Sequence, residues 1–472
     1  MRKTRIVCTL GPATRSAREI RALVKAGMDV ARLNFSHGNH EEHARDIERI
    51  RRISEELGRP LGILQDLSGP KLRVGEISGG QVRLRRGQTF TLTADAVEGD
   101  QERVRIGFPD LAHHVARRER IMLADGAIEL RVHAVRRGRI ICRVVNGGVL
   151  GSHQGVNLPQ TTLPIPAVTE KDLRDLDFGI EQGVDWVAMS FVRSGGDLAP
   201  LRERMKRRKC DLPIIAKIEK HEAVRALDEI LAAADGMMVA RGDLGVEMPI
   251  DRVPGIQKDI IRRCNLVGKP VITATQMLQS MIDNPRPTRA EVTDIANAIL
   301  DGSDAVMLSG ETAVGKYPLR AARMMDRVAR QAEKLLDFEA IRREKSLVVS
   351  GSPTDAISES CVAMAHDLRA KAIICSTSSG YTARMISKNR PRTPIVAVTP
   401  RIETYRRLGL IWGVHPLLVE TSGDTDRMLA QAQRAAKQHG FVQDGDLVII
   451  SAGVPAGVPG RTNLIKVQII GE

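Results

Sequence analysis

The chain has 472 residues, of which 42% are hydrophobic and 27% charged, with a formal net charge of +14. Because one domain usually takes roughly 100–200 residues, this length predicts several folding units. The hydrophobic share is that of an ordinary globular protein and argues against disordered and fibrous classes. Aromatic residues make up only 3% of the chain, which argues against proteins that stack nucleic-acid bases on aromatic side chains.

The positive charge is spread over nearly every segment, as on a solvated surface, although it can also attract phosphates. We therefore expect no nucleic-acid partner. The opening MRKTRIVCTLGP lacks the apolar region of a signal peptide, and no apolar run reaches about 18 residues. This predicts a cytoplasmic protein without a membrane partner. The six cysteines form no CxxC pair, so neither a zinc site nor a disulfide framework is expected.

Short apolar runs alternate with helical patterns in the first part of the chain and again in the middle. Helical patterns cover residues 17–26 and 41–57, and later ones follow each apolar run. The predicted strands are residues 5–10, 29–35, 61–67, 186–192, 213–219, 236–245, 270–275 and 304–310. Three strands before residue 70 and five after residue 168 make the number that closes a (β/α)₈ barrel. A doubly wound open sheet is the alternative.

The composition divides the chain into three predicted domains. Residues 1–69 and 169–345 form the α/β barrel, and the Gly-rich, strand-like residues 70–168 form an inserted β-barrel-like domain. After a polar stretch at residues 344–353, a helix at 354–368 and strands at 371–377, 394–399 and 446–452 predict a C-terminal α/β domain over 346–472.

Polar residues gather at the predicted strand ends, where barrel enzymes place their catalytic groups. Lys217 and Glu219 are two residues apart, so their side chains point to the same face. Asp243 ends the next strand and completes a pair of carboxylates suited to Mg²⁺. The alternative is an ordinary Lys–Glu ion pair.

The second strand brings Arg32, Asn34 and Ser36 to one side, a combination that suits a phosphate or a cation beside it. His37 follows as a ligand or as a structural residue. Asp66 ends the third strand.

Two further segments suit anions. Lys71 and Arg73 stand at the entry to the inserted domain, either as a clamp on a nucleotide phosphate or as plain hinge residues. The turn 241–243 has a central glycine, and its backbone N–H groups either bind an anion or belong to a plain loop. Together these groups form the set of cations and metal ligands that phosphoryl transfer needs.

Several segments resemble the pyruvate kinase family, and the resemblance covers nearly the whole chain. They are TLGPAT (9–14), RLNFSHG (32–38), IIAKIEKHEAV (214–224), MMVARGDLGVE (237–247) and residues 274–318. The resemblance implies transfer of a phosphoryl group from phosphoenolpyruvate to ADP, giving pyruvate and ATP in the last step of glycolysis. It also implies Mg²⁺ or Mn²⁺ as a cofactor and a lid that closes over the site.

The resemblance assigns roles residue by residue. The catalytic residues are Lys217, Arg32 and Thr275, and the divalent-metal ligands are Glu219 and Asp243. Substrate contacts come from Arg32, Lys217, Ala240, Arg241, Gly242, Asp243 and Thr275. Nucleotide contacts come from Asn34, His37 and Arg73, and the family's monovalent-cation ligands correspond to Asn34, Ser36, Asp66 and Leu67. Gln154 stands where the family often has a lysine, so one nucleotide contact differs.

Lys71 stands where potassium-dependent relatives carry a glutamate. Its neighbours also differ: Leu67, Ser68 and Val74 replace residues common in potassium users. K⁺ is typical of the family, but a lysine supplies a positive charge of its own and repels a monovalent cation. We therefore expect that K⁺ is not required. The alternative is a solvated hinge lysine that leaves the potassium dependence intact.

The segment STSSGYTAR (376–384) has hydroxyls and a glycine before a helical pattern. It is either a capping loop or a phosphate site. Its likeness to the family's effector loop implies a phosphorylated effector, within a homotetramer. The loop residues are Ser376, Thr377, Ser378, Ser379, Gly380 and Thr382. Two other functions stay open: a metal-dependent pyruvate-enolate aldolase on the same barrel, and a non-catalytic basic protein that binds anions.

Overall fold

The computed structural model describes residues 1–346, 352–421, 424–454 and 462–472. Eight parallel strands close into a barrel in the order β1-β16-β15-β14-β13-β12-β3-β2. The predicted (β/α)₈ barrel is thus confirmed, and the open-sheet alternative is wrong. The strands are β1 (Arg5–Thr9), β2 (Val30–Asn34), β3 (Gly62–Leu67), β12 (Trp186–Met189), β13 (Ile214–Ile218), β14 (Gly236–Ala240), β15 (Val271–Ala274) and β16 (Ala305–Leu308).

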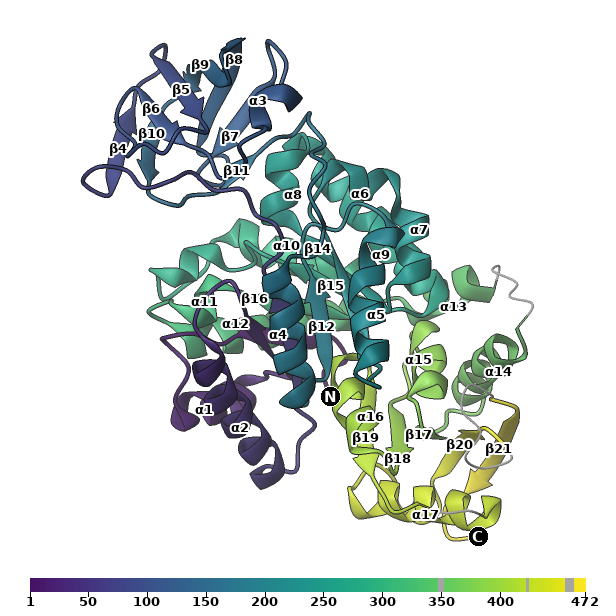
Figure 1. Cartoon of the computed structure of the whole chain (residues 1–472). Coiled ribbons are helices and arrows are strands. Elements are labelled where there is room, and N and C mark those ends of the chain that lie inside the picture. Colours follow the sequence, from purple (N-terminus) through teal and green to yellow (C-terminus); the bar gives the residue numbers. More distant parts are fainter. Residues whose placement is uncertain (347–351, 422–423, 455–461) are drawn as a thin grey trace.

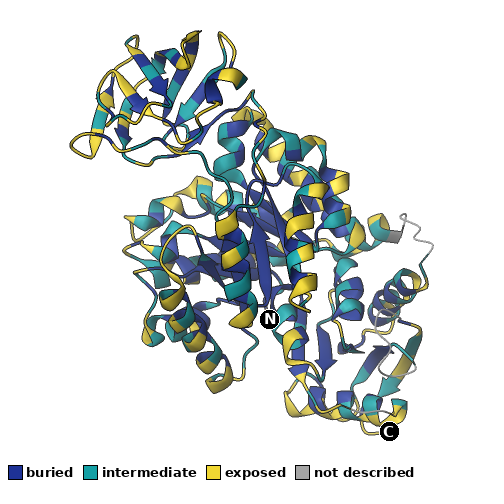
Figure 2. Cartoon of the chain, viewed as in Figure 1, coloured by how far each residue is buried: buried dark blue, intermediate teal, exposed yellow. Residues whose placement is uncertain are grey.

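The barrel strands are buried almost throughout, and Figure 2 shows them as the dark core of the molecule. An apolar layer inside the barrel includes Val7, Val30, Leu64 and Ile215. Because side chains on a strand alternate between two faces, the residues two positions later lie on the same face, one layer nearer the carboxyl ends. Those residues are Thr9, Arg32, Asp66 and Lys217. The sequence therefore places a polar layer next to the apolar layer, on the side of the carboxyl ends of the strands.

Helices surround the barrel, and several begin with side-chain caps that the sequence supplies locally. Ser16 caps α1, while Thr169 with Asp172 and Thr288 with Glu291 form capping boxes at α4 and α10. The helices of this part are α1 (Ala17–Ala26), α2 (His40–Glu56), α4 (Glu170–Glu181), α5 (Ala199–Arg207), α6 (His221–Arg225), α7 (Leu227–Ala233), α8 (Arg241–Glu247), α9 (Val253–Val267), α10 (Arg289–Leu300), α11 (Gly310–Ala313), α12 (Pro318–Ala332) and α13 (Phe338–Ser346).

Between β3 and β12 the chain forms a six-stranded sheet, β11-β7-β8-β9-β5-β6, and a two-stranded sheet, β10-β4. These sheets have their own apolar core, and Figure 1 shows them beyond one end of the barrel. We call this part the lid. Its elements are β4 (Gln81–Leu84), β5 (Thr89–Thr93), β6 (Arg103–Arg105), α3 (Leu111–His114), β7 (Arg120–Leu123), β8 (Ile128–Arg136), β9 (Arg139–Asn146), β10 (Gly148–Gly151) and β11 (Val156–Asn157).

The last part of the chain forms a five-stranded sheet in the order β19-β18-β17-β20-β21, away from the lid (Figure 1). Its strands are β17 (Ala372–Ser376), β18 (Ile395–Thr399), β19 (Val414–Leu418), β20 (Leu447–Ala452) and β21 (Leu464–Ile469). Its helices are α14 (Pro353–Asp367), α15 (Tyr381–Lys388), α16 (Ile402–Arg407) and α17 (Thr425–Gln438). The strands β19 and β21 were not predicted, because both are edge strands and lack the continuous apolar run of a central strand.

The domain boundaries after residues 69, 168 and 345 stay predictions, and residues 347–351 beside the third lie outside the described residues. No helix in the described part of the chain is long and apolar enough to cross a membrane. All six cysteines lie in described segments and are free thiols.

Candidate active site

The site lies where the barrel strands β2, β3, β13, β14 and β15 end, on the side of the lid. The fold brings Arg32, Asp66, Lys217 and Glu219 together, although they lie far apart in the sequence. All four are buried. Parallel strands that close into a barrel put all their carboxyl ends at one rim, which is why the spacing in the sequence predicted this cluster.

Lys217 is the centre of the cluster. Its Nζ lies 3.2 Å from Oδ1 of Asp66 and 3.0 Å from Oε1 of Glu219, and it donates a 2.6 Å hydrogen bond to Oγ of Ser190. Burial alone would lower the pKa of Lys217, but the charges of Asp66 and Glu219 outweigh burial and raise that pKa. The side chain is therefore a fixed ammonium, suited to bind an anion.

Arg32 and Asp66 form a second buried pair. The Nε of Arg32 donates to Oδ2 of Asp66 at 2.6 Å, and its Nη1 donates to Oγ1 of Thr9 at 3.0 Å. Burial works to raise the pKa of Asp66, but the positive charges of Lys217 and Arg32 outweigh it and lower that pKa. Asp66 is thus an anion that holds two cations side by side, a geometry suited to phosphate.

Glu219 and Asp243 are the predicted metal ligands. Oε2 of Glu219 accepts a 2.7 Å hydrogen bond from the N–H of Phe191, a non-glycine residue with φ of 56°. Burial raises the pKa of Glu219; Lys217 opposes this rise, and the charge of Asp243 adds to it. Two neighbouring carboxylates provide hard oxygen donors of the kind that Mg²⁺ prefers. A cation between them would also relieve their mutual repulsion, so Glu219 and Asp243 fit a divalent cation.

Among the described residues there is no group of three or more His, Cys, Asp or Glu side chains that could hold a metal ion. The predicted seat has two protein carboxylates. Mg²⁺ usually keeps several waters and substrate oxygens, so two carboxylates suffice.

Thr275 follows β15 with φ of 65°, and Gln276 has φ of 55°. Positive φ is an outlier for a β-branched residue, and such strain is found at functional sites. Oγ1 of Thr275 accepts a 2.7 Å hydrogen bond from the N–H of Gly242 and donates to the carbonyl of Ala274 at 2.7 Å. The structure thus joins the predicted turn 241–243 to Thr275. The helix α8 starts directly at Arg241, so this turn is the first turn of a helix.

The side chain of Arg241 reaches neighbouring helices and loops. Its Nη1 contacts Asp294 at 2.7 Å and its Nη2 donates to the carbonyl of Thr275 at 2.9 Å. The Arg241 side chain therefore holds the loop. The groups of the turn that could bind an anion are its backbone N–H groups.

The residues similar to the monovalent-cation ligands are only partly assembled. Ser36 lies in the turn after β2, so the prediction that it continues the strand is wrong. Its N–H donates to Oδ1 of Asn34 at 3.1 Å, while Asp66 is bound by Arg32 and Lys217. The carbonyl of Leu67 accepts from Oγ of Ser190 at 2.7 Å.

Lys71 has partners that the sequence did not indicate. Its Nζ lies 3.3 Å from Oδ1 of Asp243 and 3.2 Å from Oδ1 of Asp125. Within the described chain it makes no hydrogen bond or ion pair to Asn34 or Asp66. Burial would lower the pKa of Lys71, but the charges of Asp243 and Asp125 raise it.

The predicted nucleotide contacts His37 and Arg73 are both exposed to solvent, on the barrel and the lid side of the site. The Nη1 of Arg73 donates to the carbonyl of His153 at 2.9 Å. Their role stays a prediction.

The predicted effector loop lies at the start of α15, far along the chain from the barrel rim. Gly380 has φ of 82°, and its N–H donates to Oγ1 of Thr377 at 2.9 Å. Oγ1 of Thr382 lies 2.8 Å from Oγ1 of Thr462, and the N–H of Tyr381 donates to Oγ of Ser379 at 3.4 Å. These hydrogen bonds among hydroxyls and backbone N–H groups order the loop.

Sequence reasoning missed three residues of the site. Ser190 binds Lys217, Thr9 binds Arg32, and the N–H of Phe191 binds Glu219. All three stand at the end of predicted strands, so the rule that strand ends carry the chemistry could have found them.

The closed barrel and the ammonium, guanidinium and carboxylates at its rim define a (β/α)₈-barrel enzyme with a site for an anionic substrate. Two family models match the chain: "Pyruvate kinase, barrel domain" over residues 1–322 and "Pyruvate kinase, alpha/beta domain" over residues 355–468. The chain therefore belongs to the pyruvate kinase family.

Individual relatives agree. A pyruvate kinase from Geobacillus stearothermophilus is 48% identical over 474 residues, covering 100% of this chain and 81% of the relative. One from Staphylococcus saprophyticus is 46% identical over 475 residues, with the same coverage of 100% and 81%. The crystal structure of a pyruvate kinase from Cryptosporidium parvum matches with a TM-score of 0.94 and 38% identity, over 99% of this chain and 96% of that one.

The chain is accordingly a phosphotransferase that acts on phosphoenolpyruvate and ADP. The aldolase and the non-catalytic alternatives are not favoured, since the similarity extends over the full length.

Proposed function

We propose that the cluster around Lys217 performs the phosphoryl transfer of this family. The single observation that carries the assignment is the Lys217 ammonium, held 3.2 Å from Asp66 and 3.0 Å from Glu219 at the barrel rim. There it faces the charge that develops on the travelling phosphoryl group and on the enolate. Fixed charges act strongly in such a site because they need no reorganisation during the reaction.

In the proposed reaction the bond between phosphorus and the enol oxygen breaks, and a bond to the terminal phosphate oxygen of ADP forms. Arg32 binds the phosphoryl group beside Lys217. The turn Ala240–Gly242 holds the substrate carboxylate through its backbone N–H groups. The enolate then takes a proton at C3 near Thr275, which gives pyruvate.

Pyruvate kinases generally use Mg²⁺ and K⁺. We assign Glu219 and Asp243 to the divalent ion, which supplies positive charge for the phosphate oxygens when bound. The carboxylates of Glu219 and Asp243 would hold that charge next to Lys217. His37, Arg73 and Asn34 are the proposed nucleotide contacts.

For the monovalent ion we propose that Lys71 makes K⁺ dispensable. The support is its positive charge on the segment that enters the lid, next to the barrel rim. In the lid position of this structure it binds Asp243 and Asp125 instead.

We further propose a cytoplasmic homotetramer that a phosphorylated effector activates through Ser376–Thr382. The hydroxyl-rich loop at the start of α15 supports the effector, and the six free thiols support a reducing compartment. The remaining partners are phosphoenolpyruvate, ADP, ATP and pyruvate.

The test of the reaction is a coupled assay that follows pyruvate and ATP together. We expect pyruvate formation that requires ADP and produces one ATP per pyruvate. Pyruvate formation that does not depend on ADP would instead support an aldolase or a phosphatase.

A further inference from the structure

The seven-residue helix α8 connects the proposed metal seat to the lid. It carries Asp243 in its first turn and ends at Glu247. Seven residues of helix span only about 10 Å, so a displacement of one end is passed to the other. Both ends contact segments that lead into or out of the lid.

The returning segment is tied to the end of α8. The Nδ2 of Asn157, in β11, donates to Oε1 of Glu247 at 2.9 Å, and Nζ of Lys220 donates to the same oxygen at 2.7 Å. Asn157 and Glu247 are both only 3% exposed. Lys220 follows β13, the strand with Lys217 and Glu219. The Glu247 carboxylate thus joins the lid, α8 and the catalytic strand.

The outgoing segment is tied to the first turn of α8. Lys71 links Asp243 to Asp125 of the turn between β7 and β8. The next residue in that turn, Gly126, faces Val246 of α8, because a Cβ at Gly126 would lie 3.2 Å from its Cγ2. The lid therefore rests directly on α8, and Figure 1 shows α8 below the lid sheets.

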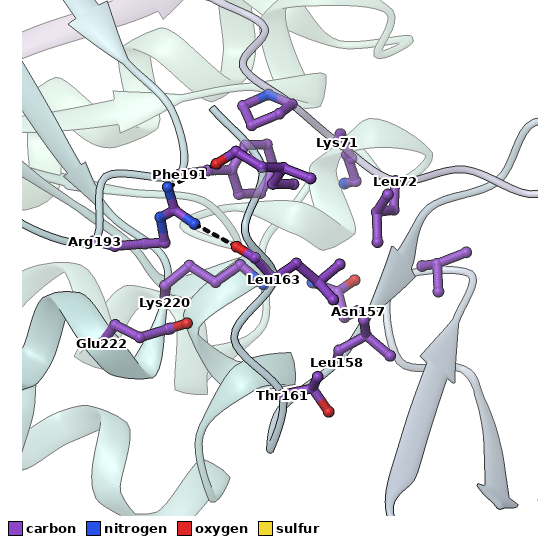
Figure 3. A pocket seen from close by; sticks show the side chains of 13 residues that line it. Lys71, Leu72, Asn157, Leu158, Thr161, Leu163, Phe191, Arg193, Lys220 and Glu222 are labelled. Carbon is purple, nitrogen blue, oxygen red and sulfur yellow. Dashed lines mark hydrogen bonds between the residues drawn. The ribbon is translucent and has the colours of Figure 1, made fainter. Parts of the chain in front are cut away.

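The outgoing segment (residues 71–73) and the returning segment (residues 155–157) are paired as one antiparallel ribbon. The N–H of Val156 donates to the carbonyl of Leu72 at 2.9 Å, and Arg73 forms an antiparallel bridge with Gly155. Figure 3 shows Lys71 and Leu72 from one segment and Asn157 and Lys220 around the same cavity. A rotation of the lid thus pulls on both ends of α8 together.

We propose that α8 couples the position of the lid to the affinity of the metal seat, with Asn157 and Glu247 as positioning residues. This inference rests on the proposed role of Asp243 as a metal ligand. Asn157 seats the lid on Glu247, and the rigid helix sets where Asp243 stands relative to Glu219. By linkage, a lid that improves metal binding is itself seated more firmly when the metal binds.

The test uses Mn²⁺ alone as the probe, titrated by calorimetry into the full chain without substrates. Loss of one buried hydrogen bond to a charged group changes an equilibrium constant by roughly tenfold. We therefore expect Asn157→Ala to weaken Mn²⁺ binding about fivefold to tenfold. The matched control is Thr162→Ala. Its hydroxyl donates to Oε1 of Glu222 at 2.7 Å, from the same returning segment, and Glu222 contacts α8 indirectly through His221, whose Nδ1 lies 3.1 Å from Glu222 and 3.8 Å from Glu247. The control should leave the affinity unchanged.

A double-mutant cycle isolates the coupling. In a Glu247→Ala background, Asn157→Ala should cause no further loss of Mn²⁺ affinity. Mn²⁺ should also slow hydrogen exchange at the amides of residues 241–247 in the wild type and do so less in Asn157→Ala. Asn157→Asp, which keeps the shape but sets a carboxylate against Glu247, repeats the test if the alanine variant does not fold.

The outcomes separate the two proposals. If Asp243→Asn weakens Mn²⁺ binding while both Asn157 variants bind it like the wild type, the coupling is wrong and the metal seat stands. If Asp243→Asn leaves the affinity unchanged, the metal seat is wrong and the coupling falls with it. Equal losses in Asn157→Ala and Thr162→Ala also overturn the coupling, because they show a general loosening of the hinge.

Discussion

At the scale of single residues, the site depends on the buried ammonium of Lys217, which the carboxylates of Asp66 and Glu219 keep charged. Arg32 and Lys217 share Asp66, so the cluster contains two cations and two anions before Asp243 is counted. An isolated buried charge is costly, whereas each of these has a partner. The four side chains are buried and held by one another, and fixed charges of this kind are what stabilising a transferring phosphoryl group requires.

Lys217→Met tests the centre of this cluster. Removal of one electrostatic contact of this kind typically costs about 10²–10³ in rate, and we expect at least that loss in kcat. The measurement is ADP-dependent pyruvate formation, with the circular dichroism spectrum as a check on the fold. Lys206→Met, at an exposed position of α5, is the control. Turnover near that of the wild type in Lys217→Met would refute the role.

Glu219→Gln and Asp243→Asn test the metal seat. Each change removes a charge but keeps the shape, so we expect each to weaken Mn²⁺ binding by about tenfold or more, since hydrogen-bonded or coordinated charges are worth over 1 kcal/mol. Calorimetric titration gives the affinity directly. Asp251→Asn, an exposed carboxylate a few residues after α8, should bind Mn²⁺ like the wild type. Unchanged affinity in both seat variants would place the metal elsewhere.

Lys71→Glu tests the potassium prediction. An ammonium that comes within about 4 Å of a second cation repels it, at a cost on the order of 4 kcal/mol at an effective dielectric of 20. We expect the wild type to be fully active in tetramethylammonium buffer free of sodium and potassium. KCl should activate only the glutamate variant.

Lys71→Met is the matched control, because it breaks the contacts with Asp243 and Asp125 without adding a negative charge. Strong activation of the wild type by KCl would contradict the prediction. Activation of the methionine variant to the same degree as the glutamate variant would show that losing the ammonium is sufficient.

At the scale of elements, the start of α15 is a preorganised turn. Its N–H groups and hydroxyls bind one another, and Gly380 adopts a left-handed backbone that suits glycine. A helix start of this kind attracts anions. A phosphate bound here must replace some of these internal hydrogen bonds.

Ser379→Glu tests that site. A carboxylate at the helix start repels a phosphate, so activation by sugar phosphates or nucleoside monophosphates should disappear while the rate without effector is unchanged. The measurement is the phosphoenolpyruvate concentration at half saturation, with and without each effector. Ser379→Ala should keep most of the activation. If none of these compounds changes the half-saturating phosphoenolpyruvate concentration of the wild type, the hypothesis is wrong.

At the scale of the whole molecule, the C-terminal sheet meets the barrel at the end opposite the lid. Arg5 of β1 donates from Nε to the carbonyl of Ile411 at 2.9 Å, and its Nη2 binds the carbonyl of Val414. The next residue, His415, packs against Phe441 with ring centroids 5.2 Å apart. Burial, and then the charges of Arg5 and Lys3, lower the pKa of His415 from 6.5 to about 3.

This depressed pKa predicts how stability depends on pH. Between pH 6.5 and 3 the unfolded chain binds a proton at His415 that the folded chain does not, so stability is full above pH 6.5 and falls as the pH drops. From pH 7 to 5 we expect the wild type to lose about 2 kcal/mol more than His415→Phe. Urea unfolding at each pH measures the difference. His439→Phe, at an exposed position, should behave like the wild type, and equal losses in all three chains would contradict the assignment.

The sequence by itself determined the barrel and most of its site. Eight apolar runs separated by helical patterns fixed the strand count, and the two-residue spacing of Lys217 and Glu219 fixed their common face. These are local patterns, set by the geometry of a strand and the position of its end. Because the carboxyl ends of parallel strands share one rim, local order was enough to predict that Arg32 and Asp66 join them.

Only the tertiary structure decided which groups meet where the lid packs on the barrel. Lys71 binds Asp243 and Asp125, and Asn157 binds Glu247 across 90 residues of sequence. No periodic pattern in the sequence predicts these contacts, because they depend on how the lid packs on α8. The edge strand β21 is defined in the same way: its half-exposed pattern becomes a strand only when β20 offers it a free edge. Packing between elements, which no local pattern encodes, made these choices.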